Sequence, residues 1–266
     1  MPQAIPFRLK AFALHLLASA TLLSLVLGGL YLGWYRWPGW YLCDALRVAP
    51  ILAAVDLVMG PLMTLLIASP RKPRRELARD ITIIAAVQIA ALAYGAGTLW
   101  QGRPLYYAYS EDRLELVQAA DLNPREVALA LQQNPQLAPH WFSLPRWVWA
   151  PLPDNAEEAQ AILAAVLNGG DDVIQMPRYF KPWTQGLAKL RAHLQALDAQ
   201  RDPHWRVGQP LLRQRLAALG YSAGAPVTII MTGRAAPLLA VFDRDTLKLR
   251  ALLRPDSRIE GGHVQH

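Results

Sequence analysis

Residues 46–100 read LRVAPILAAVDLVMGPLMTLLIA (46–68), SPRKPRRELARD (69–80) and ITIIAAVQIAALAYGAGTLW (81–100), which are two apolar runs on either side of a basic turn. The first run has 23 residues. At about 1.5 Å of helical rise per residue it can cross the ~30 Å hydrocarbon core of a bilayer, and the second run is nearly as long. Residues 69–79 carry five Lys and Arg residues against one acid, Glu76. Short loops this basic are typical of the cytoplasmic side of a membrane.

A third apolar run covers residues 11–33 and follows Arg8 and Lys10. It is longer than the ~7–15 apolar residues of a signal peptide and ends without a small-x-small cleavage site, so we interpret it as a retained signal anchor. We therefore expect a membrane protein in which residues 1–100 form a three-helix transmembrane domain. The spans are expected at residues 11–33, 46–68 and 81–100.

The basic residues also predict the orientation of these helices. The N-terminus and the 69–80 loop are basic, whereas the loop around residues 37–44 has only Arg36 at its edge. The N-terminus should therefore face the cytoplasm, and the residues from Gln101 onward should lie outside it. In a Gram-negative bacterium the spans would cross the inner membrane, and the residues from Gln101 onward would lie in the periplasm. A dense aromatic group in the first loop favours a belt at the outer headgroups over a ligand cage: Tyr31, Trp34, Tyr35, Trp37, Trp40 and Tyr41.

Composition narrows the classes of function. Of the 266 residues, 53% are hydrophobic and 18% are charged, and the apolar residues concentrate before residue 101. The net charge of +7 does not indicate binding to nucleic acid. Many of the positive charges flank the spans, and no basic stripe with interleaved aromatic residues follows them, so the expected partner is the lipid bilayer. One cysteine, Cys43, excludes an internal disulfide and a CxxC metal site, and we expect no cofactor.

Residues 101–255 predict a mixed α+β extracytoplasmic domain, and residues 256–266 predict a disordered tail. Strands are expected at residues 105–110 and 113–119, which form a hairpin, and at 227–231, 238–242 and 247–252, which form a three-stranded meander. The helices are expected at residues 124–133, 155–168, 184–199 and 209–219. Asn123 marks the start of the first of these helices, and Asp154 or Asn155 is expected to cap the second.

Asp56 stands in the second span, about 18 Å from its cytoplasmic end by helical rise. A carboxyl group at such a depth costs roughly 2.5–3.5 kcal/mol on insertion scales, so it needs a partner or a function. Ser24 and Tyr94 fall at nearly the same depth on the other two spans, and Gln88 lies somewhat nearer the cytoplasm. We expect the hydroxyls of Ser24 and Tyr94, or the amide of the nearer Gln88, to face Asp56 inside a three-helix bundle. Contact with a helix of a partner protein is the alternative role.

Gly60 and Pro61 follow this carboxyl group by one turn. Pro61 removes the hydrogen bond to the carbonyl of Leu57, so the second helix should be kinked or loosened there. An intramembrane aspartyl protease is not indicated, because that chemistry needs two carboxyl groups in one site. The nearest other acids, Asp44 and Asp80, lie near opposite ends of the spans.

No catalytic pattern stands out elsewhere. The six histidines lack metal-ligand spacing, and we interpret His15 as a polar residue near the cytoplasmic face. Two aspartate pairs, Asp171 with Asp172 and Asp243 with Asp245, suggest a sugar-nucleotide site, but both are expected outside the cytoplasm, where nucleotide sugars are absent. We therefore expect a protein that is not an enzyme. Four aromatic residues are candidates for periplasmic partner binding or for core packing: Trp141, Trp147, Trp149 and Tyr179.

Several blocks of sequence are similar to one known family. They are KAFALHLL (10–17), VDLVMGPLMT (55–64), LAYG (92–95), GRP (102–104) and EDR (111–113), and a looser likeness covers 177–182 and the last strands. On these blocks the chain resembles the TfpX/TfpZ-like type IV pilin accessory proteins. The likeness is specific over the first 120 residues and loose beyond them. One departure is WYRWP at 34–38, where WYP is expected.

The resemblance implies a non-enzymatic accessory protein of the inner membrane, encoded beside a type IV major pilin, that stabilises this pilin before it is assembled into fibres. A membrane-stored pilin keeps an apolar N-terminal helix in the bilayer and its globular head outside. Asp56 would then attract a polar or cationic group of that helix, and pilin specificity would lie in the outer domain, between residues 141 and 183. The alternatives are a membrane-tethered sensor, for which no cytoplasmic output module is seen, and a membrane enzyme acting on pilin.

Overall fold

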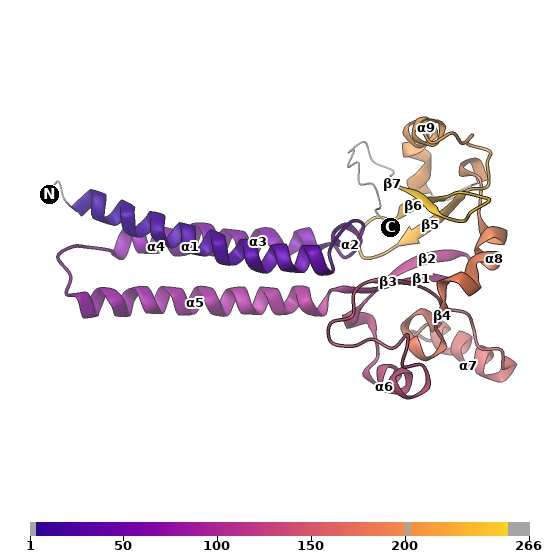
Figure 1. Ribbon diagram of the computed structural model, residues 1–266, viewed down its shortest axis with the longest axis horizontal. Coiled ribbons are helices and arrows are strands. Elements are labelled where there is room, and N and C mark those ends of the chain that lie inside the picture. The colour runs from indigo at the N-terminus through magenta and orange to yellow at the C-terminus, as the bar shows by residue number, and fades with distance from the viewer. Residues whose placement is uncertain (1–3, 200–202, 255–266) are drawn as a thin grey trace. The chain divides into compact units, whose positions relative to one another are not determined.

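The computed structural model describes residues 4–199 and 203–254, so the predicted tail at 256–266 lies outside the described residues. These residues form two compact units (Figure 1). The helical unit comprises residues 4–36 and 44–102. The sheet domain comprises residues 37–43 and the described residues from 103 onward. The expected order of three long apolar helices followed by a mixed domain of strands and helices is confirmed.

Within the described residues, three helices are long and apolar enough to cross a membrane. The first is α1 (Ala4–Gly33) and the last is α5 (Arg74–Gln101). The second consists of four consecutive pieces: the 3-10 turn η1 (Ala45–Arg47), α3 (Ala49–Ala54), the π-helix η2 (Val55–Met59) and α4 (Gly60–Ile67). Helix α5 begins before its apolar run because the basic residues there are good helix formers.

The second helix is loosened just before Pro61, as the sequence predicts. Pro61 has no backbone N–H and cannot close an ordinary α-helical hydrogen bond, and residues 55–59 adopt a π-helical turn ahead of it. Asp56 lies in this turn and is only 4% exposed. The irregular turn therefore holds the carboxyl group inside the helical unit.

Close contacts join the three helices. The side chain of Leu52 in α3 packs directly against the backbone of Gly95 in α5. A Cβ atom at position 95 would lie only 2.1 Å from Leu52 Cδ2, so a larger residue would not fit there. Tyr35 is buried, and its hydroxyl donates a hydrogen bond to the carbonyl of Leu99 at 2.6 Å. This tyrosine, which the sequence assigned to an aromatic belt, thus ties the end of α1 to the end of α5.

The sheet domain contains, in its described part, one seven-stranded sheet of order β4-β3-β1-β2-β5-β6-β7. The strands are β1 (Pro104–Ser110), β2 (Arg113–Gln118), β3 (Arg146–Trp149), β4 (Lys181–Pro182), β5 (Thr228–Thr232), β6 (Leu238–Phe242) and β7 (Leu249–Leu253). The expected hairpin and three-stranded meander are both present and antiparallel. The sequence did not predict that β2 and β5 pair in parallel, or that β3 forms and pairs in parallel with β1.

Helices and single turns complete the sheet domain. The helices are α6 (Pro124–Gln133), α7 (Ala156–Leu167), α8 (Trp183–His193) and α9 (Pro203–Ala218). The short turns are α2 (Gly39–Leu42), η3 (Ala119–Asp121), η4 (Val173–Gln175), η5 (Pro177–Tyr179) and η6 (Leu197–Ala199). Asn123 caps α6, since its Oδ1 accepts from the backbone N–H of Arg125 at 2.9 Å. Of Asp154 and Asn155, the residue that caps α7 is Asn155, whose Oδ1 accepts from the backbone N–H of Glu158 at 3.1 Å.

The helix expected over residues 184–199 was predicted too long. Helix α8 ends at His193, and Leu194 is already extended, with ψ at 133°. Gln195 then forms an antiparallel bridge with Thr228 at the start of β5. Leu194 and Leu197 are nevertheless buried, which explains their apolar spacing. Pairing with a distant strand has overridden a local helical pattern.

Two apolar clusters lie in the core of the described part of the sheet domain. One gathers residues of β1, β3 and α7, among them Tyr106, Val148 and Ile162. The other lies where α9 packs on the meander β5–β7, with Leu216 against the cluster that contains Val241 (Figure 1). The two ends of the single sheet are therefore covered by different helices.

Residues 37–43 separate the first two apolar helices in the sequence but fold with the sheet domain. Leu42 is fully buried, and its carbonyl accepts from the backbone N–H of Arg234 at 2.7 Å. Gly233 is required beside it, because a Cβ atom there would lie 2.7 Å from the same carbonyl oxygen. Burial raises the pKa of the neighbouring Cys43 thiol to about 12, so this thiol stays protonated and unreactive at neutral pH.

Gly186 tests how closely α8 packs on β3. A Cβ atom at position 186 would lie 2.6 Å from Trp149 Cγ. We expect Gly186→Ala to lower the free energy of unfolding by about 1–3 kcal/mol, because the helix must move off the sheet. The measurement is thermal unfolding of the full-length chain in detergent, followed by tryptophan fluorescence. Gly224→Ala is the control, since a Cβ atom there meets nothing within 4 Å; equal melting temperatures would contradict this packing.

Candidate functional site

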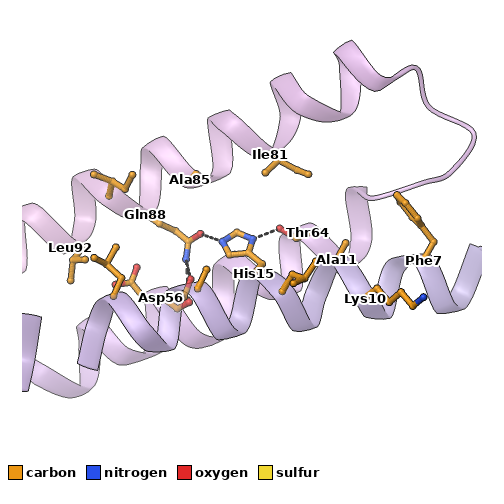
Figure 2. A pocket seen from close by; sticks show the side chains of 15 residues that line it. Phe7, Lys10, Ala11, His15, Asp56, Thr64, Ile81, Ala85, Gln88 and Leu92 are labelled. Carbon is orange, nitrogen blue, oxygen red and sulfur yellow. Dashed lines mark hydrogen bonds between the residues drawn. The ribbon is translucent and has the colours of Figure 1, made fainter. Parts of the chain in front are cut away.

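Polar side chains from three helices meet in one cluster inside the helical unit (Figure 2). His15 of α1 lies between Thr64 of α4 and Gln88 of α5, with Nδ1 2.5 Å from Thr64 Oγ1 and Nε2 2.6 Å from Gln88 Oε1. Gln88 Nε2 donates to the backbone carbonyl of Asp56 at 3.1 Å. Thr64 and Gln88 are buried, and His15 is half-buried. The cluster therefore links α1, α4, α5 and the π-helical turn.

The contact with Asp56 fixes the direction of these hydrogen bonds. A backbone carbonyl only accepts, so the amide nitrogen of Gln88 faces it and the amide oxygen faces His15. His15 Nε2 must then donate to Gln88. In the neutral ring, Nδ1 accepts from the hydroxyl of Thr64. Each of these atoms thus meets a partner of the opposite kind.

Gly60 makes room for the side chain of Gln88. A Cβ atom at position 60 would lie 2.0 Å from Gln88 Nε2. Gly60 and Pro61 therefore act together: Pro61 opens the turn that carries Asp56, and Gly60 admits the amide that bonds to it.

A groove of about 690 Å³ lies beside the cluster and is lined mainly by α1 and α5. Its walls include Leu14 of α1 and Ile89 of α5, and polar residues of the cluster lie along it. Figure 2 shows the lining side chains. An apolar wall with polar groups at its base is suited to a ligand that is itself apolar but carries a hydrogen-bonding group.

Of the three side chains expected to face Asp56, the structure brings only Gln88 to it, and the bond goes to the backbone carbonyl. Ser24 lies on an exposed face of α1, and Tyr94 is 81% exposed. The prediction compared only the depths of these residues along the spans. It did not consider that each residue of a helix is rotated by about 100° from the one before, so residues at equal depth can face different sides. Tyr94 follows Gln88 by six positions and points away, whereas Leu92 shares the buried face of α5.

His15 and Thr64 are the members of the cluster that the sequence interpretation missed. His15 was assigned to the cytoplasmic face, and Thr64 was not singled out. His15 lies four residues from the expected cytoplasmic end of the first span, at residue 11, and Thr64 lies four residues from that of the second, at residue 68. Both are therefore about 6 Å deep by helical rise. The comparison of depths that was made for Asp56 would have paired them.

The four aromatic candidates in the sheet domain do not form one surface. Trp147 packs against Trp183 with ring centres 5.0 Å apart, and Trp149 packs against the backbone of α8. Tyr179 donates a hydrogen bond to a carboxylate of α7. Trp141 is 69% exposed, so it is the member of the four that presents a large apolar surface.

The paired aspartates of the sheet domain bond to neighbouring residues. Asp171 accepts from Asn123 Nδ2 at 2.9 Å, and Asp172 pairs with Arg113 at 2.9 Å. Asp243 accepts from the backbone and the hydroxyl of a threonine three residues on, which lowers the pKa of its carboxyl to about 2. In residues 4–199 and 203–254, no three His, Cys, Asp or Glu side chains gather as metal ligands would.

Comparison with known proteins finds relatives in Dichelobacter nodosus. The chain is 26% identical over 192 residues to the fimbrial assembly protein of serogroup I and 24% identical over 192 residues to that of serogroup E1. Each match covers 71% of this chain and 72% of the relative. The chain is similar to fimbrial assembly proteins. The protein of serogroups C1 and C2 is 25% identical over 120 residues, which is 45% of this chain and 92% of that protein.

No family model matches the chain, and neither does any solved structure. The 192 matched residues outnumber those of either structural unit. The similarity to the two longer relatives therefore extends into both the helical unit and the sheet domain.

Replacing His15 tests the polar cluster. We expect His15→Leu to lower the free energy of unfolding by about 1–2 kcal/mol, because Thr64 and Gln88 lose interhelical partners. Tyr94→Phe and Ser24→Ala are the controls, since both side chains are exposed, and they should leave stability unchanged. The measurement is thermal unfolding in detergent, followed by circular dichroism. A loss with Tyr94→Phe as large as that with His15→Leu would contradict the cluster.

Proposed function

We propose that this chain is an inner-membrane accessory protein of type IV fimbriae that binds a major pilin and stabilises it before assembly. It would act as a pilin-specific chaperone and not as an enzyme. The observation that carries this proposal is the similarity to fimbrial assembly proteins, which supports a role in fimbrial biogenesis and extends into both structural units.

The finer assignment to the TfpX/TfpZ-like pilin accessory proteins draws support from where the matching blocks lie. The block at 10–17 carries His15. The block at 55–64 carries Asp56, Gly60 and Thr64, which form or adjoin the polar cluster. Two of the five blocks that carry the resemblance thus contain residues of the candidate site.

The proposed topology places the N-terminus and the basic turn in the cytoplasm and the sheet domain in the periplasm. The five basic residues at 69–79 support this orientation. A pilin stored in the membrane would then meet the helical unit with its apolar helix and the sheet domain with its globular head.

Deleting the gene in its host tests the function. We expect the major pilin to disappear from membrane fractions, as measured by immunoblot, because unassembled pilin would lose its stabilising partner. The pilin transcript should be unchanged, and a plasmid-borne copy of the gene should restore the protein. Normal pilin abundance and normal fibres in the deletion strain would refute the proposal and favour a sensor or an enzyme.

Exchanging the sheet domain tests where pilin specificity lies. The exchange must include residues 37–43 together with those from 103 onward, because Leu42 is buried in the sheet domain. With the sheet domain of a relative that serves another pilin, we expect the chimera to stabilise that other pilin. The reciprocal chimera, which exchanges only the helical unit, is the control. A pilin preference that follows the helical unit would place specificity there instead.

A further inference from the structure

The groove beside the polar cluster is long enough for several turns of a helix. On α1 its lining runs from Phe7 to Leu22, which corresponds to about 22 Å of helix. On α5 it runs from Ile81 to Leu92, or about 16 Å. Most of the side chains in the two walls are apolar, and Lys10, His15, Ser19 and Gln88 are the polar ones.

Among the described residues that line this groove, one buried side-chain oxygen has no hydrogen-bond partner. Asp56 lines the groove and is only 4% exposed, yet its Oδ2 atom has no hydrogen-bond partner within residues 4–199 and 203–254. By contrast, His15, Thr64 and Gln88 satisfy one another. A buried carboxyl oxygen without a donor is destabilising, and more so within hydrocarbon. An N–H or O–H group brought by a ligand would satisfy this oxygen.

This requirement favours a helix over a lipid chain as the occupant. An acyl chain fits apolar walls but offers no donor to a carboxyl oxygen. A membrane helix satisfies its own backbone and can carry a hydroxyl, amide or ammonium group on an otherwise apolar surface. Small residues in the walls let such a helix approach closely: Ala11, Ala18 and Ala85.

We propose that the groove between α1 and α5 binds the apolar membrane helix of the pilin, and that a hydrogen-bond donor of that helix meets Asp56 Oδ2. This inference rests on the proposed function and adds to it the surface and the side chain by which the pilin is held. It assigns the polar cluster the role of holding the groove in shape, and Asp56 that of contacting the partner.

Photo-crosslinking in host membranes tests the surface. Leu14 and Ile89 line the groove and are 70% and 59% exposed, whereas Leu17 and Val87 have similar exposure, 65% and 63%, but do not line it. A photoreactive phenylalanine analogue is placed at one of these four positions at a time in the full-length chain. We expect pilin adducts from positions 14 and 89 and none from positions 17 and 87. Equal pilin adducts from all four positions would overturn the proposal. So would groove adducts formed only with lipid or with a second copy of this chain.

Filling the groove tests its importance for pilin. Ala85 lines the groove, whereas the neighbouring Ala86 is exposed and does not line it. We expect Ala85→Phe to reduce pilin abundance to the level of the deletion strain and Ala86→Phe to leave it unchanged. Immunoblots of the chain itself must show equal levels of both variants. If Ala85→Phe does not accumulate, Ala18→Phe in the α1 wall replaces it, with Ala13→Phe as its control.

Two substitutions at Asp56 test the hydrogen bond. Asp56→Asn keeps the shape and one acceptor oxygen, whereas Asp56→Leu removes every acceptor. We expect Asp56→Leu to abolish the pilin adduct from position 14 and to deplete pilin, while Asp56→Asn retains part of both. Normal adducts and normal pilin levels in both variants would overturn the role of Asp56.

The tests separate this inference from the proposed function. If deletion of the gene leaves pilin abundance unchanged, the proposed function fails. If deletion depletes pilin but position 14 gives no pilin adduct and Ala85→Phe behaves as wild type, the chaperone function stands and the groove is not its binding site.

Discussion

Hydrogen bonds of a single histidine determine how the three apolar helices meet. Apolar helix surfaces pack in many registers, and burial alone distinguishes them poorly inside a membrane, where lipid is as apolar as leucine. His15 contacts α4 through one ring nitrogen and α5 through the other, so it fixes the facing surfaces of both neighbours. Any sliding of α1 along its partners would leave Thr64 and Gln88 without partners, which is the costlier state for buried polar groups.

The irregular turn in the second helix follows from this arrangement. Pro61 opens the π-helical turn at residues 55–59, and Gly60 lets the Gln88 amide reach the carbonyl of Asp56. The amide therefore satisfies the backbone of the turn, while Asp56 Oδ2 has no hydrogen-bond partner among the described residues. A regular helix in this place would have no need of the amide from α5, and a larger residue at position 60 would exclude it.

Features that involve only neighbouring residues could be predicted from the sequence. The side of a helix that a residue faces, and contacts with residues distant in the sequence, could not. Helix caps such as Asn123 involve only a few consecutive residues, so they were predicted correctly. Depth along a span is also a local quantity, but the side of the helix is not, and Tyr94 was therefore assigned to the wrong face. Gln195 and Leu42 were missed for a related reason, because each is fixed by contacts with residues far away in the sequence. His15 was missed although its depth matched that of its partner.

The connectivity of the two units bears on how the chain would hold a pilin if it acts as proposed. The chain passes between the units three times, because residues 37–43 leave the helical unit, fold into the sheet domain and return. A pilin with one part in the groove and another on the sheet domain would form its second contact intramolecularly, at a high effective concentration. Two individually weak contacts would then suffice to retain the pilin, and loss of either one would release it. Weak, paired contacts suit a partner that must be held before assembly and given up during it, whereas one tight site would oppose transfer to the fibre.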